Sequence, residues 1–205
     1  MCQEVLKIVQ KMNQKHIETK LAIYCAPLIA GLKVSNLFIV SANEVEDLSQ
    51  VLRKTGLVFL KLADVNGRVT FLLFRREELR EHLADRKVQQ ILRECGYEDL
   101  SFRGILYRFM ERYQAYAKGE RNYPHEIGLL LGYPAEDVEG FILHNGQNYL
   151  FAGYWKVYAD APQKQELFRQ YEAAEQEVVV LLSQGTGIGQ IIKSYSGRYQ
   201  MKLVS

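Results

Sequence analysis

Cysteine, proline and tryptophan are scarce in this chain of 205 residues, which contains three, four and one of them. The cysteines Cys2, Cys25 and Cys95 form no CxxC pair. An odd number of cysteines without that spacing argues against a zinc knuckle and against a thioredoxin-type redox pair. We therefore expect no metal site and a reduced, cytoplasmic setting.

Long apolar runs and an excess of one charge are also missing. Charged residues interrupt the apolar stretches, so we expect no membrane span, signal peptide or transit peptide. Lys and Arg number 26 against 24 Asp and Glu, and this balance does not indicate a nucleic-acid or membrane-surface partner. A hydrophobic content of 48% with 24% charged residues is typical of a globular chain.

The clearest structural signal is a β-hairpin. Two alternating apolar runs, 57–62 and 68–74, flank the dipeptide Asn66-Gly67. This dipeptide is the strongest short hairpin signal because both residues tolerate a positive φ. We expect the hairpin to form the centre of a mainly antiparallel sheet.

Other segments complete a predicted α+β fold. Apolar residues at 36–40 and 149–158 predict two further strands, and amphipathic helices are expected between the strands. We expect a single domain over 1–183, with about four strands flanked by helices. A C-terminal tail follows over 184–205, and its glycines would allow it to be flexible.

The tail begins with Gly185-Thr186-Gly187-Ile188-Gly189, which invites comparison with a phosphate-binding loop. The spacing is GxGxG rather than GxGxxG, and the preceding segment resembles a helix rather than a strand. A helix terminus explains these glycines better than a nucleotide site does.

Two residues could carry nucleophilic chemistry. Cys25 precedes a helical turn that begins near Pro27, where unpaired N–H groups would favour a thiolate. The alternative for Cys25 is a small buried side chain, which is the commoner fate of a free cysteine. His125 lies in an apolar stretch between Pro124 and Pro134, and on its position alone a structural role is favoured for it.

Three segments combine apolar, polar and turn-forming residues in distinctive patterns. They are CAPLIAGLK from Cys25 with the following NLF from Asn36, PHEIGLLLGYPAEDVEGFI from Pro124, and WKVY from Trp155. Together they resemble the motifs of a family of uncharacterised proteins, a domain of unknown function from clostridia and related anaerobic Firmicutes. The resemblance covers residues 17–182.

The resemblance implies little mechanism. The family usually carries His before the first motif's cysteine and Cys before WKVY, whereas this chain has Tyr24 and Tyr154. A mechanism that needs a His–Cys pair or a second thiol is therefore not implied here. The family's genes often lie near flavodoxin and iron-uptake genes, which implies a flavodoxin-like or iron-related partner.

Functions of two different classes fit the motif residues, and a purely structural role is a third possibility. A ligand- or partner-binding accessory protein would use the motifs as walls of one pocket, and we expect this function. Its candidate binding residues are Lys33, Asn36, Tyr133, Asp137, Trp155 and Lys156. The alternative is a cysteine-dependent hydrolase or transferase with Cys25 as nucleophile, His125 as base and Glu126 or Asn36 as orienting group. The sequence identifies neither the cofactor nor the ligand.

Overall fold

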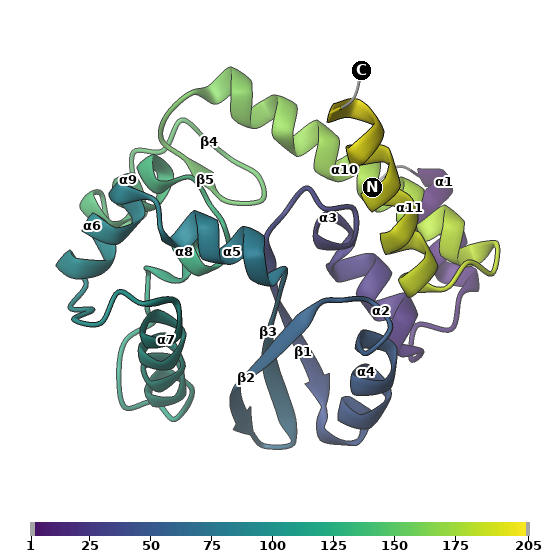
Figure 1. Ribbon diagram of the computed structural model, residues 1–205, viewed down its shortest axis with the longest axis horizontal. Coiled ribbons are helices and arrows are strands. Elements are labelled where there is room, and N and C mark those ends of the chain that lie inside the picture. The colour runs from purple at the N-terminus through teal and green to yellow at the C-terminus, as the bar shows by residue number, and fades with distance from the viewer. Residues whose placement is uncertain (1–2, 204–205) are drawn as a thin grey trace.

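The computed structural model describes residues 3–203 and confirms an α+β fold (Figure 1). The helices are α1 (Gln3–Lys11), α2 (Ile17–Tyr24), α3 (Ala26–Ile29), η1 (Ala42–Glu44), α4 (Val45–Leu52), α5 (Arg76–Leu83), α6 (Arg86–Glu94), α7 (Phe102–Ala117), α8 (Ile127–Leu130), α9 (Ala135–Leu143), α10 (Ala161–Ser183) and α11 (Ile188–Leu203). The strands are β1 (Ser35–Ser41), β2 (Val58–Val65), β3 (Arg68–Phe74), β4 (Phe151–Ala152) and β5 (Lys156–Val157).

The predicted hairpin is confirmed. Strands β2 and β3 pair in antiparallel fashion around a turn in which Asn66 and Gly67 have φ values of 51° and 75°. Strand β1 pairs with the other edge of β3, which gives the order β1-β3-β2. Strand β3 is therefore central, and it is buried from Val69 to Phe74.

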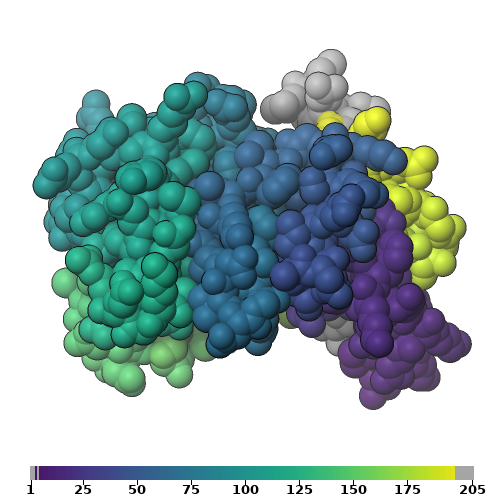
Figure 2. All heavy atoms as spheres, turned by 90° about the horizontal axis from the view of Figure 1, so that it is seen from below, coloured from purple at the N-terminus to yellow at the C-terminus, as the bar shows by residue number. Residues whose placement is uncertain are grey.

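The two faces of this sheet pack against different helices. Val69, Phe71 and Leu73 point into one cluster of buried side chains, which we name the first core cluster. Helices α1–α4, α10 and α11 contribute to it. Leu72 and Phe74 point into a second core cluster, to which α5–α9 contribute. Figures 1 and 2 show the sheet between these two groups of helices.

The long strand expected over 149–158 is instead a short two-stranded hairpin, β4–β5. Its turn is closed by the Gly153 N–H, which donates to the carbonyl of Trp155 at 3.0 Å. A Cβ atom at Gly153 would lie 2.3 Å from Phe168, so the close approach of α10 requires glycine. A third core cluster forms here from Trp155, Val157, Phe168 and Tyr171.

The segment after residue 183 packs against the first core cluster. Helix α11 buries Ile188, Ile191 and Ile192 in it, which differs from a flexible tail over these positions. Gly185 and Gly187 lie between α10 and α11, and Gly189 lies in the first turn of α11, as the helix-terminus interpretation predicts. The backbone N–H of Ile188 donates to Glu18 at 3.0 Å. No helix within residues 3–203 is both long enough and apolar enough to cross a membrane.

Candidate ligand-binding site

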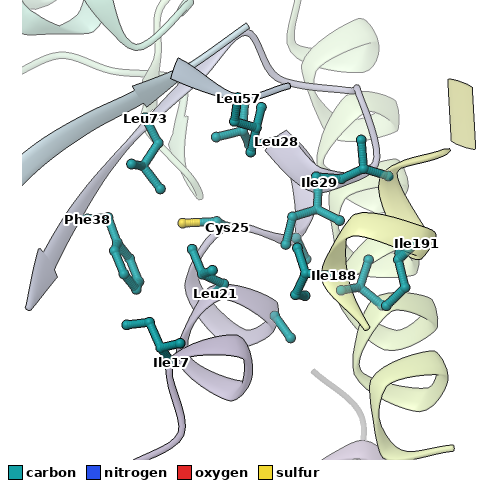
Figure 3. Close-up of a cluster of buried hydrophobic side chains, with 14 of the residues drawn as sticks. Ile17, Leu21, Cys25, Leu28, Ile29, Phe38, Leu57, Leu73, Ile188 and Ile191 are labelled. Atoms are coloured by element: carbon teal, nitrogen blue, oxygen red, sulfur yellow. The ribbon is translucent and has the colours of Figure 1, made fainter. Parts of the chain in front are cut away.

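Cys25 lies at the junction of α2 and α3 and is 1% exposed. Figure 3 shows its sulfur atom pointing toward the strands that carry Phe38 and Leu73. Asn36 Nδ2 donates to Cys25 Sγ at 3.4 Å, and the thiol does not cap α3. Burial raises the pKa of the Cys25 thiol to about 12. The side chain is therefore a neutral thiol inside the first core cluster.

Asn36 connects this thiol to a lysine. Its Oδ1 accepts a hydrogen bond of 2.8 Å from Lys33 Nζ. Burial lowers the pKa of Lys33 to about 8, and the nearby Cys25 partly opposes this shift. Lys33 Nζ also lies 5.2 Å from the centroid of the Tyr133 ring, which is within the range of a cation–π contact. The first motif thus contacts the second motif directly.

The second and third motifs meet through rings and a carboxylate. Tyr133 stacks on Trp155 with centroids 4.8 Å apart and an interplanar angle of 25°. Trp155 Nε1 donates to Asp137 Oδ2 at 2.7 Å. Asp137 Oδ1 accepts from the backbone N–H groups of Tyr158 and Ala159 at 2.8 and 3.1 Å. A continuous series of contacts therefore runs from Cys25 to Asp137.

A pocket of about 350 Å³ opens beside the Tyr133–Trp155 pair, and we name it the aromatic pocket. Its rings belong to Tyr123, His125, Tyr133, Phe141, Tyr154 and Trp155. Its other lining residues are Ile127, Gly128, Leu131, Asp137, Val138 and Lys156. A volume of this size is at the small end of the range for ligand sites, about 300–1,000 Å³.

His125 and Lys156 add polar groups to this lining. His125 is exposed, and its ring centroid lies 5.2 Å from that of Phe141. Lys156 Nζ donates to the carbonyl of Gly146 at 2.7 Å. The same ammonium group lies 4.9 Å from the centroid of the Tyr149 ring. Both residues could therefore donate hydrogen bonds to a molecule in the pocket.

Glu126 follows His125 in sequence but belongs to a different environment. It is 2% exposed, and Oε1 lies 2.6 Å from Arg112 Nε and accepts from the Tyr97 hydroxyl at 3.1 Å. Burial, followed by the charge of Glu126, raises the pKa of Tyr97 above its usual value. Glu126 is thus engaged by Tyr97 of the second core cluster and by Arg112 of α7 rather than by His125.

The structure separates the three proposed catalytic residues. His125 lines the aromatic pocket, whereas neither Cys25 nor Glu126 belongs to its lining. Cys2 lies outside the described residues. Within residues 3–203, no three His, Cys, Asp or Glu side chains gather in a way that could hold a metal ion.

Four of the six candidate binding residues line the pocket: Tyr133, Asp137, Trp155 and Lys156. Lys33 and Asn36 do not line it, but Lys33 contacts the lining residue Tyr133 and donates to Asn36. Sequence reasoning missed Tyr123 and Phe141, although Phe141 is part of the second motif. The signal that could have found Phe141 is its helical spacing from Asp137 and Val138 on α9.

A family model described as "Protein of unknown function (DUF3793)" matches residues 21–192 of the chain. These residues include all three motifs. Neither a curated protein nor a solved structure matches the chain.

Proposed function

The chain belongs to the DUF3793 family of proteins of unknown function, and we propose that it is a binding protein whose aromatic pocket holds a small molecule. The observation that carries this proposal is the composition of the pocket. Tyr133 of the second motif and Trp155 of the third form one wall, and further contacts fix both side chains. Preformed apolar pockets with a few polar groups are typical of ligand sites.

Fixed side chains favour binding because little conformational entropy is lost when a ligand arrives. Trp155 is held by Asp137 and also lies edge-on to Phe168, with centroids 4.6 Å apart. Tyr133 is placed between Trp155 and Lys33. The site therefore does not need to be assembled by the ligand.

A cysteine-dependent enzyme has less support. A nucleophilic cysteine reacts as the thiolate and must be reached by its substrate. Cys25 is buried, and its pKa is raised to about 12, so the thiolate is rare at neutral pH. A flavodoxin-like or iron-related partner remains a prediction that rests on the resemblance alone.

The proposal can be tested with a fragment library, because the chain's single tryptophan lines the pocket. We expect fragments that bind to change the emission of Trp155. Ligand-observed NMR would measure the same fragments on the His125→Trp variant, in which a larger exposed ring narrows the pocket. A His16→Trp variant is the matched control, because His16 is also exposed but lies outside this pocket.

The expected result is loss of fragment binding in His125→Trp and its retention in His16→Trp. Fragments that bind both variants equally well would show that binding occurs elsewhere. A library without any fragment that changes the Trp155 emission would also contradict the proposal.

A further inference from the structure

The aromatic pocket is lined by a carboxylate, that of Asp137, whose oxygens already accept hydrogen bonds from the protein. Asp137 is the one acidic side chain among the described residues that line it. Its two oxygens accept hydrogen bonds from the Trp155 indole and from the backbone of Tyr158 and Ala159. A carboxylate used in this way stabilises the wall and offers no strong site for a ligand cation.

Two carboxylates next to lining residues are also partnered. Glu175 accepts a hydrogen bond from the Tyr154 hydroxyl at 2.7 Å. Glu136 forms an ion pair of 2.8 Å with the buried Lys164. Neither residue contributes to the lining of the pocket. These two carboxylates are therefore engaged by groups of the protein itself.

The ammonium group of Lys156, which lines the pocket, has N–H donors that are not used by the protein's own hydrogen bonds. An ammonium group carries three N–H donors, and Lys156 gives one of them to the carbonyl of Gly146. The neighbouring rings of Tyr149 and Phe141, at 4.9 and 5.8 Å, hold the ammonium group without consuming its donors. His125 supplies a further ring N–H in the same lining. The polar side of the pocket is therefore suited to an anion.

The rest of the lining is suited to a flat, apolar body. Tyr133 and Trp155 present one stacked pair, and His125 and Phe141 present another group of rings. Aromatic rings gain from offset or edge-on contact with other rings beyond the area that they bury. The volume of about 350 Å³ limits such a ligand to a compact one.

From these observations we infer that the ligand of the aromatic pocket is a small planar aromatic carboxylate. Its ring system contacts Tyr133, Trp155 and Phe141, and its carboxylate accepts hydrogen bonds from Lys156 and His125. This inference rests on the proposed function, because it names the class of molecule that the same pocket holds.

Calorimetry with three probes tests the inference. 2-Naphthoate has both the rings and the charge, 2-naphthamide lacks the charge, and cyclohexanecarboxylate lacks the aromatic ring. We expect 2-naphthoate to bind at least about tenfold more tightly than 2-naphthamide, as is typical of a charge-assisted hydrogen bond. It should also bind more tightly than cyclohexanecarboxylate, which cannot make the contacts between aromatic rings. The Lys156→Met variant should lose the preference for 2-naphthoate over 2-naphthamide, and Lys156→Arg should retain it.

The matched control is Lys7→Met, which removes an exposed lysine of α1 that lies outside the pocket. It should leave all three affinities unchanged. Binding of 2-naphthoate should also be lost in His125→Trp. This loss would show that the probe binds in the aromatic pocket.

Three outcomes would overturn the inference. Equal affinities for 2-naphthoate and 2-naphthamide would show that the pocket does not select an anion. Binding of 2-naphthoate that survives His125→Trp would place the anion elsewhere. Failure of all three probes would reject this ligand class, whereas the proposed function is decided separately by the fragment library.

Discussion

The indole N–H of Trp155 donates to Asp137 across 2.7 Å, and this bond joins the second and third motifs through two residues that are 18 positions apart in sequence. The same carboxylate holds the backbone that follows β5, through Tyr158 and Ala159. One buried side chain therefore fixes both the ring and the backbone of the wall of the aromatic pocket.

Replacing Asp137 by asparagine should destabilise the protein. Asparagine has a single acceptor oxygen, so it cannot serve both the Trp155 indole and the backbone N–H groups, and its amide would face another donor. We expect a loss of about 1–3 kcal/mol in the free energy of unfolding, as for a buried donor left unsatisfied. Urea unfolding measures this loss.

The control for this substitution is Glu139→Gln, also on α9. Glu139 pairs with Lys87 at 3.0 Å on the surface, where an ion pair contributes at most about 1 kcal/mol. Equal losses for the two variants would contradict the role that we assign to Asp137.

Cys25 should resist alkylation in the folded protein. The thiol is 1% exposed and its pKa is raised to about 12, so iodoacetamide at neutral pH should modify it only after unfolding. Mass spectrometry of the labelled peptides gives the extent of reaction, with the half-buried Cys95 as an internal comparison. Rapid modification of native Cys25, slowed by His125→Ala, would instead revive the enzyme hypothesis.

The pH dependence of stability should report on Lys33. Its pKa falls from the usual 10.5 to about 8 on folding, so between these values the unfolded chain binds a proton that the folded protein has released. The free energy of unfolding therefore rises with pH in this window. Cys25 acts in the opposite direction, increasingly as the pH approaches and passes 9, because folding raises its pKa from the usual 9.0 to about 12.

Between pH 8 and pH 9 the contribution of Lys33 exceeds that of Cys25, because the folded Cys25 keeps its proton and the unfolded Cys25, with an ordinary pKa of about 9, still holds at least half of it. Urea unfolding across this interval should show a steeper rise for the wild type than for Lys33→Met. Other groups that titrate at alkaline pH are present in both proteins, so their contributions cancel in the difference between the two profiles. Parallel profiles would show that the Lys33 ammonium is not disfavoured by folding.

Gly67→Val should weaken the central hairpin. Gly67 has a φ of +75°, and a β-branched residue is strained at such a value by roughly 1 kcal/mol or more. No atom lies within 4 Å of the position that a Cβ would occupy, so the cost comes from the backbone and not from a collision. Gly67→Asn is the control, because asparagine tolerates this conformation. A denaturant midpoint unchanged by valine would count against this explanation.

The parts of the fold that depend on local chemistry could be predicted from the sequence. The β2–β3 hairpin follows from Asn66-Gly67 and two alternating runs, and both signals are local. The strand expected over 149–158 was wrong because its alternation of apolar residues continues through the turn at Gly153. That turn is decided by the approach of Phe168 from α10, which no local pattern reveals.

The candidate site was predictable to a similar extent. Tyr133 and Trp155 could be proposed as members of one site because rings and polar groups in motifs need partners. The divergence of His125 and Glu126 could not be predicted, because adjacent residues at the start of a short helix point in different directions. Glu126 is drawn to Arg112 and Tyr97, which are distant in sequence.

The division of the helices between the two faces of the sheet has a consequence for synthesis on the ribosome. The second core cluster is built from one continuous stretch of chain, from β2 through α9, and can form as soon as that stretch has emerged. The first core cluster requires α2 and α3 from the beginning of the chain together with α10 and α11 from its end. Until α10 and α11 have been translated, the apolar face formed by Val69, Phe71 and Leu73 therefore lacks its full cover. A nascent chain stalled before α10 would expose this surface to chaperones and to aggregation.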